Sequence, residues 1–331
     1  LVQWLFGTIP VPLPGVYLLL ALGFGNLVWG GIVKAPKSWQ RPGLLIAHCG
    51  ILLLIAAGFV TYHFAENGHI TLYEGDETNT FQSYYDWEVT VSETGPDAKT
   101  QLVIPQDDFL RLAGATTRTF YAPDLPFDLE LSGYMANSEP RAVAPGTASA
   151  TGDVVLDAAP RVSDAESNMA GLHAAVIEPG GKRQDAVLWG AARTPWIVDV
   201  GGKTYAVDLR HATTELPFSI RLEKFTRELH PRTGIASNFQ SEVTQIENGI
   251  PRHVVIKMNE PLRYKGYTLF QSSWGPQNAA EGTRLFSVFA VVRNPADQWP
   301  LYASCVMALG LLLHFTQSLV RYLRAQQRRS A

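Results

Sequence analysis

The stretch from Gly43 to Val60 is eighteen residues long, contains no charged side chain, and has His48 as its only clearly polar residue. About eighteen consecutive apolar residues are the minimum for a helix that crosses a lipid bilayer. Two more runs reach this length, one from about Pro14 to Val33 and one from about Trp299 to Val320. The sequence therefore predicts three transmembrane helices, with a large domain between the second and the third.

The overall composition fits this division. Hydrophobic residues make up 46% of the chain and charged residues 17%, yet the mean hydropathy is only +0.01. Such an average is expected when a few very apolar segments are joined to a polar domain of ordinary composition. The net charge of −3 provides no basic surface and no nucleic-acid-binding motif is present, so no nucleic acid is expected as a partner.

Both cysteines, Cys49 and Cys305, lie in apolar runs. The polar part of the chain therefore has neither a disulfide framework nor a thiolate metal site. The sequence also lacks C-x-x-C-H, the motif through which a chain attaches its own c-type haem. Covalent attachment of haem to this chain is therefore excluded.

Positive charge predicts the orientation, because short loops rich in Lys and Arg stay in the cytoplasm. Lys34, Lys37 and Arg41 lie between the first two apolar runs, and four arginines follow the third. Both clusters are cytoplasmic only if the large domain is extracytoplasmic. The predicted order is an outer-face N-terminal segment at 1–13, a helix at 14–33, a cytoplasmic loop at 34–41, a helix at 42–63, an extracytoplasmic domain at 64–296, a helix at 297–322 and a cytoplasmic tail at 323–331. Since the chain begins with Leu and its first thirteen residues carry no charge, we expect its true N-terminus to be missing. Because the predicted orientation leaves residue 1 outside, we expect the missing part to contain one more transmembrane helix.

Two of the predicted helices carry a histidine at a similar depth. With a rise of about 1.5 Å per residue, His48 lies roughly 9 Å and His314 roughly 10 Å from the cytoplasmic ends of their helices. An ionisable side chain inside a bilayer is costly and commonly functional, so both are predicted to bind a cofactor. The alternative is a hydrogen bond between helices, worth about 1 kcal/mol. His63, at the outer face, is more typical of an interfacial residue.

Residues 64–296 have the pattern of a mainly β domain. Short runs that alternate apolar and polar residues, such as "HITLYEG", "WEVTVSE" and "HVVIKM", recur between segments rich in Gly, Pro and Asn. This pattern predicts a sandwich or a barrel, with residues 136–153 as a mobile loop. The predicted fold class is a membrane protein with transmembrane α-helices and a large extracytoplasmic, mainly-β, sandwich-like domain.

Catalytic motifs are absent from this domain. The sequence has no H-E-x-x-H, no G-x-S-x-G and no glycine-rich phosphate loop, and no two carboxylates have the spacing of an acid–base pair. Its histidines are scattered, as is typical of surface or strand positions: His69, His173, His211, His230 and His253. No catalytic residue is predicted, and the domain is interpreted as a scaffold or a binding surface.

Several segments resemble the ResB proteins, also called CcsB, of the system II machinery for cytochrome c maturation. The most specific segment is "NEPLRYKGYTLFQSS", preceded by "LPFSIRLEKFTRELHPRTGIASNFQSEVTQIENG". "AHCGILLLIAAGF" followed by "GHITLYEGDE" resembles the family's helix that leads into its outer domain, and "RNPADQWPLYASCVMALGLLLHF" resembles its closing helix. The resemblance extends over nearly the whole chain.

The resemblance implies a multi-pass protein of the bacterial cytoplasmic membrane, embedded in membrane lipid, with a large periplasmic domain. It implies that the protein carries haem, here haem b, across the membrane and presents it to apocytochrome c. It also implies a CcsA-like (ResC-like) integral membrane partner with a tryptophan-rich motif, and His48 as an axial ligand of the haem iron. His314 is predicted from its depth alone. Since this chain lacks the tryptophan-rich motif, any cytochrome c synthase (haem lyase) activity would need that partner.

An alternative function is a non-catalytic structural membrane subunit of a larger respiratory or multihaem complex. In that case the outer domain is a docking platform and His48 is a packing residue. A hydrolase on a membrane anchor is disfavoured, because no nucleophile–base pair is present. The proteins that co-purify with the chain distinguish the first two functions, since a CcsA-like protein favours haem delivery and a set of redox subunits favours the structural role.

Overall fold

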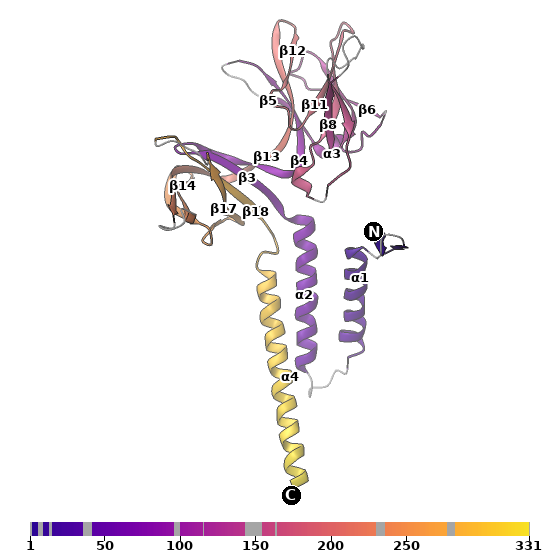
Figure 1. Cartoon of the computed structure of the whole chain (residues 1–331), viewed down its shortest axis with the longest axis vertical. Helices are drawn as coiled ribbons and strands as arrows, with labels where there is room; N and C mark the ends of the chain where they lie inside the picture. Colours follow the sequence, from indigo (N-terminus) through magenta and orange to yellow (C-terminus); the bar gives the residue numbers. More distant parts are fainter. Residues whose placement is uncertain are drawn as a thin grey trace. The chain divides into compact units, whose positions relative to one another are not determined.

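The computed structural model of the chain describes residues 2–5, 9–12, 15–35, 42–95, 100–114, 116–142, 154–162, 164–229, 236–276 and 282–330. The chain divides into two compact units (Figure 1). A helical unit comprises Leu1–Ala65 and Arg293–Ala331, and a β unit comprises Glu66–Val292.

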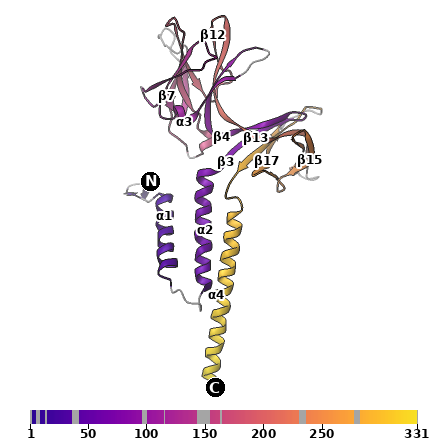
Figure 2. The same ribbon diagram turned by 180° about the vertical axis from the view of Figure 1, so that it is seen from behind.

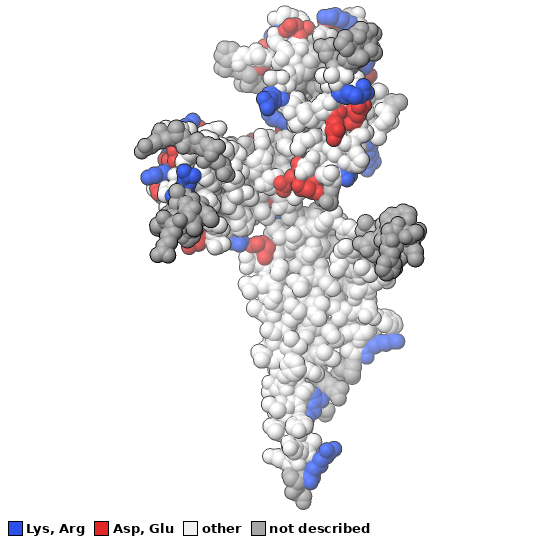
Figure 3. Space-filling model, viewed as in Figure 1, with Lys and Arg blue, Asp and Glu red and all other residues white. Residues whose placement is uncertain are grey.

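The helical unit holds three helices that are long and apolar enough to cross a membrane, counted over the described residues. α1 (Val16–Asn26) continues directly into η1 (Leu27–Val33), α2 spans Pro42–Phe64, and α4 spans Trp299–Ser330. A short hairpin of β1 (Val2–Leu5) and β2 (Ile9–Pro12) precedes them. The visible surface of the helices is uncharged along most of their length (Figure 3), as lipid-facing helices require.

The first of these helices is not a regular α-helix throughout. The sequence predicts one helix over residues 14–33, and the structure instead has an α-helix followed by the π-helical turn η1. α1 is apolar and buries none of its residues, which is typical of a helix with lipid on most sides. A π-helical turn is rare in proteins and is frequently found at functional sites.

α2 and α4 pack closely because small residues face each other across the contact. Gly43, Ala47 and Gly50 are buried on α2, and Ala303 and Gly310 are buried on α4. A Cβ atom added at Gly310 would lie 2.5 Å from the nitrogen of Ala47 and 2.7 Å from the oxygen of Gly43. Small residues let membrane helices approach this closely and gain van der Waals contact. The contact therefore fixes which side of α2 faces α4.

The β unit contains strands β3 to β18. In chain order the strands are β3 (Glu66–Tyr73), β4 (Glu77–Glu93), β5 (Thr100–Pro105), β6 (Thr117–Phe120), β7 (Asp128–Met135), β8 (Ser138–Ala142), β9 (Val154–Ala158), β10 (Gly171–Ile177), β11 (Arg183–Trp189), β12 (Trp196–Val200), β13 (Lys203–Leu229), β14 (Ala236–Glu247), β15 (Ile250–Lys257), β16 (Leu262–Tyr264), β17 (Tyr267–Gly275) and β18 (Phe286–Arg293). Two short helical turns, α3 (Gln106–Phe109) and η2 (Ala165–Ser167), lie between them.

Two long strands organise the β unit. β4 and β13, with 17 and 27 residues, are paired antiparallel over much of their length. In one half, β5 pairs with β4 and β12 pairs with β13. In the other half they are part of the strand order β15-β14-β13-β4-β3-β18-β17-β16 (Figures 1 and 2).

Each half of the β unit encloses a core of its own. In the first lobe, the sheet β11-β10-β7-β6 packs face to face on β4, β5, β12 and β13, with Val89, Leu131 and Val207 fully buried. In the second lobe, all eight strands supply side chains to one core around Ile220, Leu269 and Phe289, so the sheet is curled around that core. The predicted mainly-β domain is confirmed, with a sandwich in the first lobe and a curled sheet in the second.

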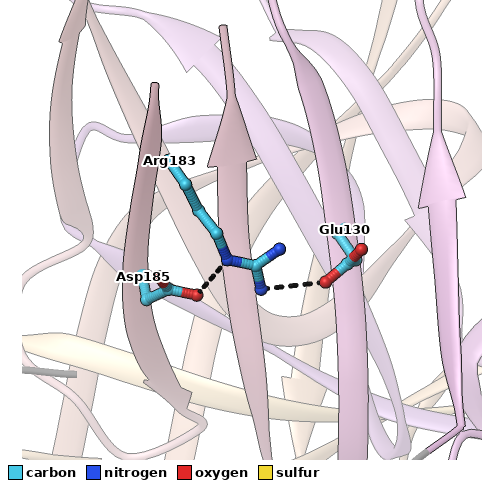
Figure 4. A network of polar contacts seen from close by, with 3 residues as sticks. All are labelled: Glu130, Arg183 and Asp185. Atoms are coloured by element: carbon cyan, nitrogen blue, oxygen red, sulfur yellow. Dashed lines mark hydrogen bonds and ion pairs between the residues drawn. The ribbon is translucent and has the colours of Figure 1, made fainter. Parts of the chain in front are cut away.

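The outer face of the sheet β11-β10-β7-β6 is polar. Arg183 on β11 reaches across β10 to Glu130 on β7, with 2.9 Å from Nη2 to Oε1, and its Nε donates to Asp185 at 2.8 Å (Figure 4). Ion pairs exposed to this degree contribute little to stability. The network instead keeps the charged side chains on the face turned away from the core.

The prediction of a mobile loop at residues 136–153 was wrong for the first part of that range. Ser138–Ala142 forms strand β8, which pairs antiparallel with β9. Pro140 lies in this strand and has no backbone N–H to donate, a loss that a short two-stranded hairpin tolerates. Residues 143–153 lie outside the described part of the chain.

Substitution of Gly310 by Ala is expected to destabilise the helical unit by roughly 1–3 kcal/mol, because the added methyl group would overlap the backbone of α2. Gly58→Ala on α2 is the matched control, since nothing lies within 4 Å of its Cβ position. Thermal unfolding of the purified protein in detergent measures both. Equal unfolding temperatures for the two variants would contradict the close α2–α4 contact.

Candidate functional site

His48 is held by the helix that precedes it in the chain. It follows Ala47 on α2 and is therefore rotated by about 100° from the side that faces α4. Its ring is half-buried, and its Nδ1 lies 3.0 Å from the carbonyl oxygen of Gly31 in η1. The structure thus shows the interhelical hydrogen bond that the packing interpretation of His48 requires.

Gly31 makes this approach possible. A Cβ atom added at Gly31 would lie 2.8 Å from Nδ1 of His48 and 3.0 Å from Cδ1 of Leu27. No real Cβ atom sits that close to a ring nitrogen, so only glycine lets the imidazole reach the main chain of η1 at this point. The neighbouring Gly30 has no such constraint, because the nearest atom to its Cβ position is 4.0 Å away.

The bond to Gly31 also determines which nitrogen of the His48 ring carries a proton. A carbonyl oxygen only accepts hydrogen bonds, so Nδ1 is protonated, and in the neutral ring Nε2 keeps its lone pair. Histidines that bind metals commonly donate their other ring N–H to a backbone carbonyl, which orients the ring and raises the basicity of the ligating nitrogen. The geometry of His48 therefore suits both helix packing and metal ligation through Nε2.

His314 belongs to α4, and it approaches α2 on a different side from the one that carries His48. A Cβ atom added at Gly43 would be 2.5 Å from the backbone nitrogen of His314, which places His314 along the α2–α4 contact. Its Nδ1 is buried without a hydrogen-bond partner, as is Oε1 of Gln317 one turn further along α4. His48 and His314 share no hydrogen bond or ring contact, and thus the structure does not bring the two predicted ligands together.

His63 borders the large cavity of the helical unit. The cavity has a volume of about 1030 Å³, lies between α1 and the second half of α2, and is lined by Tyr17, Phe59 and Tyr62 among other apolar residues. The His63 ring is exposed and contacts the rings of Phe59 and Tyr62 at 4.4 and 5.1 Å. His48 is not among the lining residues. His63 thus has the aromatic neighbours expected of an interfacial residue.

The β unit contains no preformed cluster of metal ligands, since no group of three or more His, Cys, Asp or Glu among the described residues is suitably placed. His69, His173, His211 and His253 all lie on strands, as expected from the sequence, and His230 is outside the described residues. The sequence did not indicate that Nδ1 of both His69 and His211 is buried without a partner. These two residues are far apart in the sequence, so no spacing pattern could have linked them.

Comparison with known proteins supports the resemblance noted above. The model of the ResB-like family matches residues 32–283, a range that contains His48 and nearly all of the β unit but not His314. Two curated relatives, both named cytochrome c biogenesis protein CcsB, come from Prochlorococcus marinus strains NATL1A and NATL2A. Each is 41% identical over 70 residues, which is 21% of this chain and only 16% of the relative's length. Because the family match covers well over half of the chain, the protein belongs to the ResB-like family.

Proposed function

We propose that this protein is the haem-holding subunit of a membrane complex for cytochrome c biogenesis, with His48 as an axial ligand of the haem iron. Family membership and the name of the two relatives support the role in cytochrome c biogenesis. The observation that carries the ligand assignment is the hydrogen bond from Nδ1 of His48 to Gly31, which leaves Nε2 as a free lone-pair donor.

We further propose that the protein lies in the bacterial cytoplasmic membrane, with its β unit on the periplasmic side. Three helices long enough to span a membrane support the location. The orientation rests on Lys34 after η1 and on the arginines at the end of α4, Arg321, Arg324, Arg328 and Arg329, because short basic segments stay in the cytoplasm.

His48 has the chemistry needed to hold haem, the substrate carried by the complex. A neutral imidazole is an ordinary axial ligand of haem iron. The carbonyl of Gly31 would keep the ring oriented and increase electron density at Nε2. Since the cavity between α1 and α2 does not include His48, the porphyrin would sit at a boundary with a partner subunit.

His314 and Gln317 each have a buried polar atom without a hydrogen-bond partner on α4. Unpaired polar atoms inside a membrane are costly, and both residues present one on the same face of α4. We propose that a polar group of the partner or of haem pairs with them in the assembled complex. The partner is expected to be a CcsA-like integral membrane protein, and apocytochrome c would receive the haem near the β unit.

The protein is not proposed to catalyse the attachment reaction alone. When bound, haem would supply the vinyl groups that are joined to the two thiols of C-x-x-C-H in apocytochrome c, and the sequence of this chain predicts no catalytic residue for that step. Its own part is to bind and orient haem through His48 and to keep it in apolar surroundings away from water.

The alternative function, a structural subunit of a larger respiratory complex, is favoured by one observation. The hydrogen bond between His48 and Gly31 joins α2 to η1 and is sufficient by itself to explain a polar side chain in this helix. In that case Nε2 of His48 would bind no iron, and the haem content of the complex would not depend on His48.

Substitution of His48 by Ala is expected to remove most of the haem absorbance of the purified complex, because the iron loses a ligand that apolar surroundings cannot replace. Added imidazole should restore part of the spectrum by filling the vacated position. Absorption spectra of the complex co-purified with its membrane partner measure both effects, and His63→Ala is the control. An unchanged spectrum in His48→Ala would leave the structural role as the explanation.

Substitution of Gly31 by Ala is expected to weaken haem binding on the order of 10- to 100-fold, because the methyl group displaces the His48 ring from its carbonyl partner. Gly30→Ala is the matched control within the same π-helical turn, since its Cβ position is open. Haem titration of the complex and the reduction potential of the bound haem measure the change. Identical values for the two variants would show that Gly31 does not orient the ligand.

A further inference from the structure

Two histidines of the β unit are brought to the same face of one sheet by strand pairing. β4 lies between β3 and β13. His69 on β3 is opposite Gln82 on β4, and Gln82 is opposite Thr213 on β13. His211 precedes Thr213 by two residues and therefore points to the same face of the sheet as Thr213, Gln82 and His69.

A bulge in β4 lies between the two histidines. Gln82 pairs with Thr213, whereas the next pair in the ladder is Trp87 with His211, so β4 holds additional residues from Ser83 to Asp86. Ser83 closes this bulge: its Oγ accepts hydrogen bonds from the backbone nitrogens of Tyr85 and Asp86 at 3.2 and 3.1 Å. Bulges of this kind redirect side chains and are over-represented beside functional sites.

Aromatic rings hold both imidazoles in place. The His211 ring is stacked on Trp87 with 4.0 Å between ring centroids, and the His69 ring is stacked on Tyr84 at 5.2 Å. Trp87 is itself fixed against Gly190, where an added Cβ atom would lie 2.2 Å from the indole ring. The two imidazoles are therefore oriented by packing before any ligand binds.

Both imidazoles have an unused buried nitrogen. Nδ1 of His69 and Nδ1 of His211 are buried and have no hydrogen-bond partner. In a neutral imidazole one ring nitrogen carries the proton and the other keeps its lone pair, so Nδ1 of either ring can bind a metal ion when the proton is on Nε2.

We propose that His69 and His211 form a binding site for a borderline transition-metal ion such as Zn²⁺, Ni²⁺ or Cu²⁺, with Nδ1 of each ring as a ligand. Imidazole is a common ligand of these ions. The ion would satisfy two buried nitrogens at once and would join β3 to β13 across the bulge of β4. Water would complete the coordination of the ion.

The surroundings favour a metal ion over a proton as the missing partner. Burial lowers the pKa of both His69 and His211, and the proximity of the two rings lowers the pKa of His211 further. The acidic groups that face the pair, Glu166 and Asp86, act in the opposite direction but do not cancel the effect of burial. Both rings are therefore neutral at pH 7, which is the form that binds metals. The buried position of Nδ1 favours a bare ion over haem.

The site is tested with the full chain, purified in detergent through a tag without histidine and treated with a chelator. Isothermal titration with Zn²⁺ and Cu²⁺ is expected to show one ion per chain. His69→Gln and His211→Gln should each weaken binding at least about tenfold, the loss expected when one of two protein ligands is removed. His253→Gln is the control, because Nδ1 of His253 already has a partner in Thr244 at 3.1 Å.

Two measurements on the unmodified site keep the test decisive even if a variant fails to fold. Electron paramagnetic resonance of the Cu²⁺ complex should show hyperfine coupling to two imidazole nitrogens, and Cu²⁺ should quench a fluorescence component that is missing in Trp87→Phe. Binding should also weaken as the pH falls below about 6.5, since protons then compete for Nδ1. Equal affinity in the wild-type and both His→Gln proteins, or no quenching of Trp87, would overturn the proposal.

Discussion

The contact between α2 and α4 determines where the functional side chains of the helical unit can lie. In a membrane there is little hydrophobic driving force between helices, so close backbone packing of small residues is a main source of their association. Gly43, Ala47 and Gly50 occupy the side of α2 that meets α4. His48 follows immediately after Ala47 and must therefore face away from α4, toward η1. The position of the histidine is thus a consequence of glycine and alanine placed beside it.

Much of this arrangement could be predicted from the amino-acid sequence, because it depends on local patterns. Length and hydropathy were enough to identify three apolar helices, since a bilayer imposes one minimum length on all of them. Alternation of apolar and polar residues was enough to identify a mainly-β domain. Short segments such as "NEPLRYKGYTLFQSS" were enough to indicate the family to which the comparison then assigned the chain. Each of these predictions uses residues that are neighbours in the sequence.

The parts that could not be predicted depend on pairing between distant residues. The carbonyl partner of His48 is provided by a π-helical turn, and the apolar sequence "LVWGGIV" does not distinguish such a turn from an ordinary α-helix. The sequence predicts a similar depth for His48 and His314, but depth carries no information on rotation about the helix axis and therefore does not predict whether the two histidines face each other. His69 and His211 lie on the same face of the sheet only because β4 pairs with both of their strands, and the bulge at residues 83–86 sets their register.

The continuity of β4 and β13 has a mechanical consequence for the β unit. Two domains joined by a linker can rotate independently, whereas these two lobes have no linker, because the same two strands pass through both cores. Any hinge between the lobes would have to break ladder hydrogen bonds between β4 and β13. That ladder is irregular at two places, between His211 and Thr213 and between Glu215 and Ile220. The β unit should therefore behave as one stiff body whose compliance is concentrated at these two places.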